Sequence, residues 1–224
     1  MKNFIPSSLI LLIALIFAGC SEHGVNPTTK LLDTSVISPL VTGDEWIYDV
    51  SLLDSAGIHV DDFQDTVKVG LSTEIKGEMW YLVSHNNPNI KKNDTRATSF
   101  FSNRQDGYYF LQENSRKPFR LFKYPVQAGF TEQTQSDVIN IVTSTNEIIQ
   151  LDSSAFTCNH YQVIFFTLQN SDTIRKQIGD DSYLCPGIGL VREISHFDGT
   201  TNPRTGAFIV NGSEVITLKS YTLK

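Results

Sequence analysis

The chain has 224 residues and a formal net charge of −6 at pH 7, from 24 acidic and 18 basic residues. The basic residues occur as short pairs, such as Lys91-Lys92 and Arg116-Lys117, and never as a continuous stripe. A nucleic-acid partner is therefore excluded, because binding to a phosphate backbone needs a concentrated positive surface.

The N-terminus has the pattern of an export signal. Lys2 supplies a positive charge, residues 9–17 form an apolar run, and small residues lead into Cys20. The run is shorter than the ~20 apolar residues that cross a bilayer, so residues 1–19 are interpreted as a signal peptide. Phe17-Ala18-Gly19-Cys20 resembles a bacterial lipobox, in which the cysteine is acylated and becomes the new N-terminus.

The lipobox resemblance implies a lipid-anchored protein of the bacterial cell envelope. Cys20 would carry acyl chains such as palmitate, and each buried CH₂ contributes about 0.8 kcal/mol to membrane binding. Ser21 follows Cys20 where Asp would favour retention, which implies sorting to the outer membrane. Residues 20–38 are rich in Ser, Thr, Asn and Pro and predict a flexible tether.

From residue 39 onward the apolar residues alternate with polar ones, as in half-buried strands. Val67, Val69 and Leu71, for example, are expected to share one buried face. Asn211-Gly212 predicts a tight hairpin between residues 207–210 and 214–223. About a dozen such strands predict one all-β domain over residues 39–224, a single antiparallel curved sheet forming a barrel or half-barrel, with a sandwich as the alternative.

Two cysteines remain if Cys20 carries lipid. Cys158 and Cys185 would lie in an oxidising compartment, which favours a disulfide between them. That bond would close a loop of about 28 residues and contribute roughly 3–4 kcal/mol. Two buried free thiols, or a metal site that includes His160, are the alternatives.

Aromatic residues occur as adjacent pairs inside predicted strands. Since neighbours on a strand point to opposite faces, some of these rings lie outside a single-sided core. They predict a surface for an apolar ligand or a partner protein, with simple core filling as the alternative. The candidate residues are Trp80, Tyr81, Phe100, Phe101, Tyr108 and Tyr109.

Three short segments carry a family resemblance: Pro39-x-x-x-Gly43-x-x-Trp46, Cys185-Pro-Gly-Ile-Gly-Leu-Val191 and Leu218-Lys-Ser-Tyr221. Together they resemble uncharacterised bacterial envelope lipoproteins that combine an early Gly-x-x-Trp strand with a late Pro-Gly-[Val/Ile]-Gly-Leu-Val turn. The resemblance covers most of residues 39–224 and implies no catalytic residue. The β-rich lipoprotein carriers of the envelope are similar in class, which implies a half-barrel with an apolar cavity.

A weak internal repeat accompanies these segments. Pro125-x-x-x-Gly129 repeats the pattern of Pro39-x-x-x-Gly43, and each is followed by residues that alternate with period two. The repeat predicts two similar halves, with chance similarity as the alternative.

The sequence contains no recognised catalytic motif such as a nucleophile elbow, a P-loop or His-Glu-x-x-His. The pairs Asp61-Asp62 and Asp180-Asp181 are expected in turns, pointing to opposite faces, and so do not form an acid–base couple. We therefore expect no cofactor, no metal and no enzymatic activity, but an envelope protein that binds an apolar ligand or an envelope partner. The alternatives are a hydrolase whose site is assembled from distant residues, and a structural subunit of an envelope complex.

Overall fold

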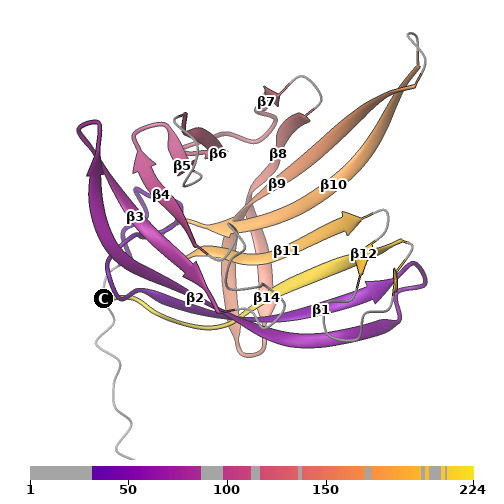
Figure 1. Ribbon diagram of the computed structural model, residues 1–224, viewed down its shortest axis with the longest axis horizontal. Helices are drawn as coiled ribbons and strands as arrows, with labels where there is room; N and C mark the ends of the chain where they lie inside the picture. Colours follow the sequence, from indigo (N-terminus) through magenta and orange to yellow (C-terminus); the bar gives the residue numbers. More distant parts are fainter. Residues whose placement is uncertain are drawn as a thin grey trace, which may run out of the picture. The chain divides into compact units, whose positions relative to one another are not determined.

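The computed structural model describes residues 32–86, 98–111, 117–135, 138–169, 173–197, 200–201, 208–209 and 211–224. Residues 32–224 form one compact unit, whereas the predicted signal peptide, residues 1–19, and Cys20 lie outside the described part of the chain. All elements in the described part are strands (Figure 1). Among these residues there is no helix with the length and apolar character of a membrane span.

Twelve strands form one antiparallel sheet, which confirms the predicted all-β fold. One half of the sheet contains β1 (Glu45–Asp54), β2 (His59–Ile75), β3 (Glu78–His85), β4 (Thr98–Arg104), β5 (Gly107–Leu111) and β6 (Phe119–Lys123). The other half contains β7 (Thr131–Gln135), β8 (Val138–Leu151), β9 (Ser154–Gln169), β10 (Thr173–Cys185), β11 (Gly189–Phe197) and β14 (Gly212–Thr222). The halves meet where β1 pairs with β14, and β12 (Thr200–Thr201) pairs separately with β13 (Phe208–Ile209).

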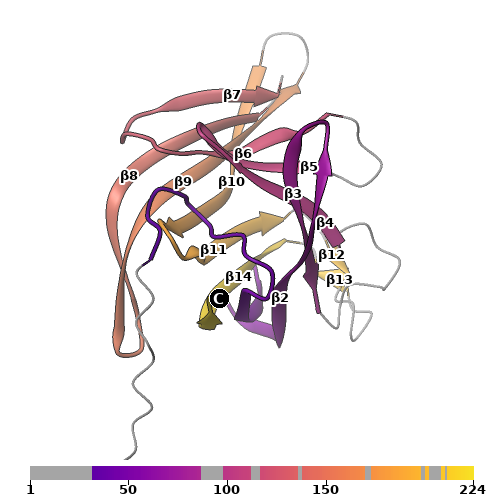
Figure 2. The same cartoon turned by 90° about the vertical axis from the view of Figure 1, so that its left-hand side faces the viewer.

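The strand order forces the sheet to curve. β6 and β7 are consecutive in the chain but lie at the two opposite edges of the sheet. A flat sheet of this order would be about 53 Å wide at ~4.8 Å per strand spacing. The connection through residues 124–130 spans at most about 29 Å. The edges must therefore approach each other, and β6 and β7 lie near each other in both views (Figures 1 and 2).

The two halves begin with the same turn, as the internal repeat predicted. Gly43 and Gly129 both have positive φ, 96° and 85°, at the third position of a four-residue turn. The Gly43 amide donates to Val69 O and the Gly129 amide to Val142 O, at 2.9 and 2.7 Å. Val69 and Val142 are both buried, on the second strand of their respective halves. The Pro-x-x-x-Gly repeat therefore marks equivalent positions in the fold.

The predicted Asn211-Gly212 hairpin does not form. β13 pairs with β12, and β14 starts at Gly212 between β1 and β11. A Cβ at position 212 would lie 2.2 Å from the Leu53 carbonyl oxygen. This glycine is required because two neighbouring strands approach it closely, and not because it turns the chain.

Two further strand predictions are corrected. A register shift between Val69 and Ser72 turns Leu71 outward, so Leu71 is 78% exposed although Val69 is buried. The pairs Asp61-Asp62 and Asp180-Asp181 lie inside β2 and β10 and not in turns. In the first pair Asp61 is buried and Asp62 is exposed, whereas Asp180 and Asp181 are both half-buried.

Residues 32–38, assigned to the tether from sequence, pack across the inner face of the sheet. Ile37 is 1% exposed, and the Val36 carbonyl accepts a hydrogen bond from the Gly187 amide at 2.8 Å. Gly187 and Gly189 have positive φ, and a Cβ on Gly189 would lie 2.7 Å from Ser38 Oγ. The glycines of the Pro-Gly-Ile-Gly turn thus allow this segment to lie directly against the turn.

Candidate functional site

A cavity of about 300 Å³ lies on the inner face of the curved sheet. Its volume is at the lower end of the range of small-molecule sites, about 300–1,000 Å³. Both halves of the sheet contribute apolar side chains to its wall. Leu40, which follows the segment of residues 32–38, contributes another. The principal apolar lining residues are Trp46, Val67, Val83, Phe101, Leu190 and Ile216.

A contact between an imidazole and a carboxylate lies in the wall of this cavity. His85 Nδ1 is 2.8 Å from Asp65 Oδ2, and the two residues come from the paired strands β3 and β2. Asp65 is only 8% exposed, and its other oxygen, Oδ1, is buried without a hydrogen-bond partner. The wall therefore carries an incompletely satisfied carboxylate within mostly apolar surroundings.

A second carboxyl group, Glu193 on β11, lines the same cavity. It accepts hydrogen bonds from Ser182 Oγ at 3.1 Å and from Ser195 Oγ at 3.2 Å. Burial raises the pKa of Glu193 to about 7, and the Asp180 carboxylate adds to the increase, while the two serine hydroxyls lower it. Glu193 therefore changes its charge near neutral pH.

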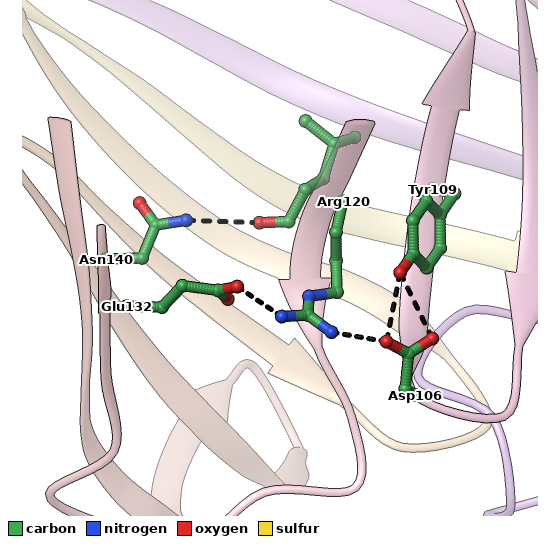
Figure 3. Close-up of polar contacts among 6 residues, drawn as sticks. Asp106, Tyr109, Arg120, Glu132 and Asn140 are labelled. Atoms are coloured by element: carbon green, nitrogen blue, oxygen red, sulfur yellow. Dashed lines mark hydrogen bonds and ion pairs between the residues drawn. The ribbon is translucent and has the colours of Figure 1, made fainter. Parts of the chain in front are cut away.

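The edge strands β6 and β7 meet at a seam without a backbone ladder, and Leu121 and Phe122 of β6 also line the cavity. Arg120 on β6 bridges Asp106, in the β4–β5 turn, and Glu132 on β7 (Figure 3). The Tyr109 hydroxyl donates to the same Asp106 carboxylate at 3.0 Å. Side-chain ion pairs thus join the two edges of the sheet.

Side chains also donate hydrogen bonds to backbone carbonyl groups of the edge strand β6. Asn140 Nδ2 donates to Leu121 O at 3.4 Å (Figure 3), and the Tyr161 hydroxyl donates to Lys123 O at 2.7 Å. Satisfied carbonyls make an edge strand less available for pairing with another chain. The sheet is therefore a half-barrel in which side chains satisfy carbonyl groups of one edge strand.

The six aromatic residues singled out from sequence divide between the two faces. Phe101 and Tyr108 stack at 5.2 Å and line the cavity, and Tyr81 packs against the same core. Trp80 and Tyr109 contact the Arg104 guanidinium, at 5.6 and 4.1 Å from their ring centroids. All six, including the half-buried Phe100, are buried or half-buried, so they do not form one exposed surface.

Cys158 and Cys185 are joined by a disulfide with an S–S distance of 2.01 Å. They lie on the neighbouring strands β9 and β10 within the main core. His160, the third member of the alternative metal site, instead stacks on Tyr183 and contacts Asp181 through Nε2 at 2.8 Å. The part of the chain that the structure describes contains no group of three or more potential metal ligands.

Sequence reasoning missed the polar groups of the cavity, Asp65, His85 and Glu193. A signal was present, because Asp65 is in phase with the apolar positions Val67 and Val69 on one strand. Glu193 is similarly in phase with the fully buried Val191. A charged residue at a position that the alternation assigns to the buried face destabilises the fold unless it is paired. Such a residue therefore marks a candidate site.

No protein-family model matches the chain, and no curated protein matches it in sequence. Several solved structures have a similar fold. An exported protein with a YmcC-like fold from Bacteroides fragilis has a TM-score of 0.47 at 9% identity, over 83% of this chain and 98% of that one. A protein described as a lipoprotein from Parabacteroides distasonis has a TM-score of 0.46 at 11% identity, over 84% and 98%. A LolA-superfamily protein from Nitrosomonas europaea has a TM-score of 0.25 at 9% identity, over 87% and 94%. All three TM-scores are below 0.5, so these similarities indicate no function for this chain.

Proposed function

We propose that this protein is a non-enzymatic, lipid-anchored bacterial envelope protein that holds an apolar ligand inside its half-barrel. The observation that supports binding is the cavity, whose wall is built from buried and half-buried apolar side chains of both halves of the sheet. Apolar walls with a few polar groups are typical of small-molecule sites. The lipobox at Cys20 supports the anchor and the envelope location, with the outer membrane favoured by Ser21.

The seam supplies a route by which such a ligand enters. Elsewhere in the main sheet, neighbouring strands are joined by backbone hydrogen-bond ladders, whereas β6 and β7 are joined by the side chain of Arg120. Side-chain ion pairs near a surface cost little to break, about 1 kcal/mol each. Separation of β6 from β7 therefore opens the inner face without unfolding the sheet.

Ligand binding is tested with decanol, a neutral apolar probe, by isothermal titration calorimetry on the purified full-length protein. Val67→Trp fills the cavity and is expected to abolish binding. Leu71→Trp makes a similar change on the same strand, but at an exposed position, and is expected to leave binding unchanged. Absence of decanol binding to the parent protein, or equal binding by both variants, would contradict the proposal.

A further inference from the structure

The strand register places Asp65 and His85 on the inner face of the sheet as diagonal neighbours. Val67 lies directly opposite His85 on the paired strands β2 and β3, and Asp65 is two residues before Val67 on β2. Directly opposed residues share a face of the sheet, as do residues two apart on one strand. The 2.8 Å contact between His85 Nδ1 and Asp65 Oδ2 therefore joins two side chains that both line the cavity.

This contact determines which atom of His85 is left for a ligand. In a neutral imidazole one ring nitrogen donates a hydrogen bond and the other accepts one. A carboxylate only accepts, so Nδ1 carries the proton and Nε2 is the acceptor. Within the described part of the chain Nε2 has no hydrogen-bond partner, but it is not fully buried as Asp65 Oδ1 is, and the His85 side chain is 30% exposed.

Two other polar groups of the lining already have partners. The Tyr48 hydroxyl donates to Leu190 O at 3.2 Å, and Glu193 accepts hydrogen bonds from two serine hydroxyls. Glu193 also lies on β11, which is four positions from β3 in the strand order. This leaves His85 Nε2 as the acceptor for a ligand that packs beside Val67.

The surroundings of Nε2 favour a neutral donor over a charged group. An ionised carboxylate has no proton to donate, and it would add an acidic group to a wall that contains Asp65 and Glu193 but no Lys or Arg among the described lining residues. A charged ammonium group loses its hydration in an apolar space, where one oxygen of Asp65 is buried and the other is held by His85. A hydroxyl donates a hydrogen bond without carrying a charge into the cavity.

We propose that the ligand is a neutral amphiphile with a terminal hydroxyl, and that this hydroxyl donates its hydrogen bond to His85 Nε2. The apolar chain of the ligand occupies the space lined by Val67, Val83 and Ile216. Asp65 is a positioning residue, because it acts by holding the imidazole in the tautomer that accepts at Nε2. This inference rests on the proposed function and adds the chemical class of the ligand.

The test uses decanol and decyl methyl ether, which have the same ten-carbon chain and the same oxygen position, although only decanol donates a hydrogen bond. Dissociation constants are measured at pH 8 on the purified full-length protein by titration of tryptophan fluorescence, since Trp46 lines the cavity. We expect decanol to bind more tightly than the ether. Decanoate, which has no proton to donate at this pH, should bind more weakly than decanol.

Two variants test the hydrogen bond itself. His85→Phe keeps an aromatic ring but removes the acceptor, and should lower the preference for decanol over the ether about three- to tenfold, the effect of one neutral hydrogen bond. Asp65→Asn should lower the same preference and reduce the population of the tautomer with a proton on Nδ1, measured from the ¹⁵N chemical shifts of the His85 ring. His59→Phe and Asp62→Asn alter an exposed His–Asp contact on β2, outside the cavity, and are the matched controls that should change neither quantity.

The outcomes separate the ligand class from the function. An equal preference for decanol in the parent and in His85→Phe would overturn the hydroxyl proposal and leave the binding function intact. A proton on Nε2 of His85 in the parent protein, or tighter binding of decanoate than of decanol, would also overturn it. Failure of decanol, the ether and decanoate to bind would instead overturn the binding function itself, and the hydroxyl proposal with it.

Discussion

The Trp46 indole Nε1 donates a hydrogen bond of 2.7 Å to the carbonyl oxygen of Ile188, 142 positions further along the chain. Both residues are buried, and the bond connects β1 to the turn between β10 and β11. It joins two of the three segments on which the resemblance to envelope lipoproteins rests, Gly-x-x-Trp and Pro-Gly-Ile-Gly. In this chain the first segment supplies the donor and the second the acceptor.

Trp46→Phe should destabilise the protein because it leaves the Ile188 carbonyl buried without a donor. We expect a loss of about 1–3 kcal/mol in the free energy of unfolding, measured by urea denaturation. Trp80→Phe removes a similar ring volume at another buried tryptophan and serves as the comparison. An unchanged urea midpoint for Trp46→Phe would show that the hydrogen bond contributes nothing.

Glu193→Gln should change how stability depends on pH. The pKa of Glu193 is about 7 in the folded protein and 4.5 as the ordinary value, so the folded state binds more protons between these pH values. Stability is therefore lost as pH rises from about 4.5 to about 7, and the Gln variant lacks this loss. We expect the variant to gain up to about 3 kcal/mol over the parent at pH 8, and less to the extent that water reaches the carboxylate.

Urea denaturation at pH 5 and pH 8 measures this effect. Asp49→Asn, at an exposed ion pair with Lys219, should show no comparable difference between the two pH values. A gain for Glu193→Gln that is the same at pH 5 and pH 8 would mean that ionisation of this residue is not its source.

Arg120→Gln should loosen the seam between β6 and β7. The substitution leaves Asp106 and Glu132 without their shared partner and should cost about 1–2 kcal/mol. It should also raise the dissociation rate of bound decanol several-fold, measured by stopped-flow tryptophan fluorescence. Lys68→Gln removes the ion-pair partner of Glu45, on the central strands β2 and β1, and should leave that rate unchanged. Equal dissociation rates for the two variants would argue against a route through the seam.

Replacement of both Cys158 and Cys185 by alanine should destabilise the protein by roughly 2–4 kcal/mol, because the disulfide closes a loop between residues 27 positions apart. Reducing agent should lower the thermal midpoint of the parent and leave that of the double variant unchanged. If the reducing agent lowers the thermal midpoints of the parent and the double variant equally, the disulfide does not account for the difference in stability between them.

Cys20→Ser should abolish acylation and release the protein from the membrane fraction. Metabolic labelling with radioactive palmitate, followed by fractionation of the cell envelope, measures both effects. The parent should be labelled and sediment with membranes, since two or more acyl chains give stable anchoring. Palmitate incorporation that persists in Cys20→Ser would place the lipid elsewhere.

The register of the sheet limited what could be predicted for individual strands. Alternation holds in β1, where Trp46, Tyr48, Val50 and Leu52 share one buried face because the strand keeps its period over those positions. It failed at Leu71, where a bulge adds a residue and reverses the face. It also failed at Gly212, since a glycine that permits close strand approach looks the same in sequence as a turn glycine.

The sequence by itself determined the all-β class and suggested the equivalence of the two Pro-x-x-x-Gly turns, because both depend on local periodicity and local backbone conformation. Only the tertiary structure decided that β6 and β7 meet at a seam and that Asp65 and Glu193 line the same cavity. These residues lie on strands far apart in the chain, and their proximity follows from the curvature of the whole sheet. Curvature is a property of strand order and connection length together, which no single segment encodes.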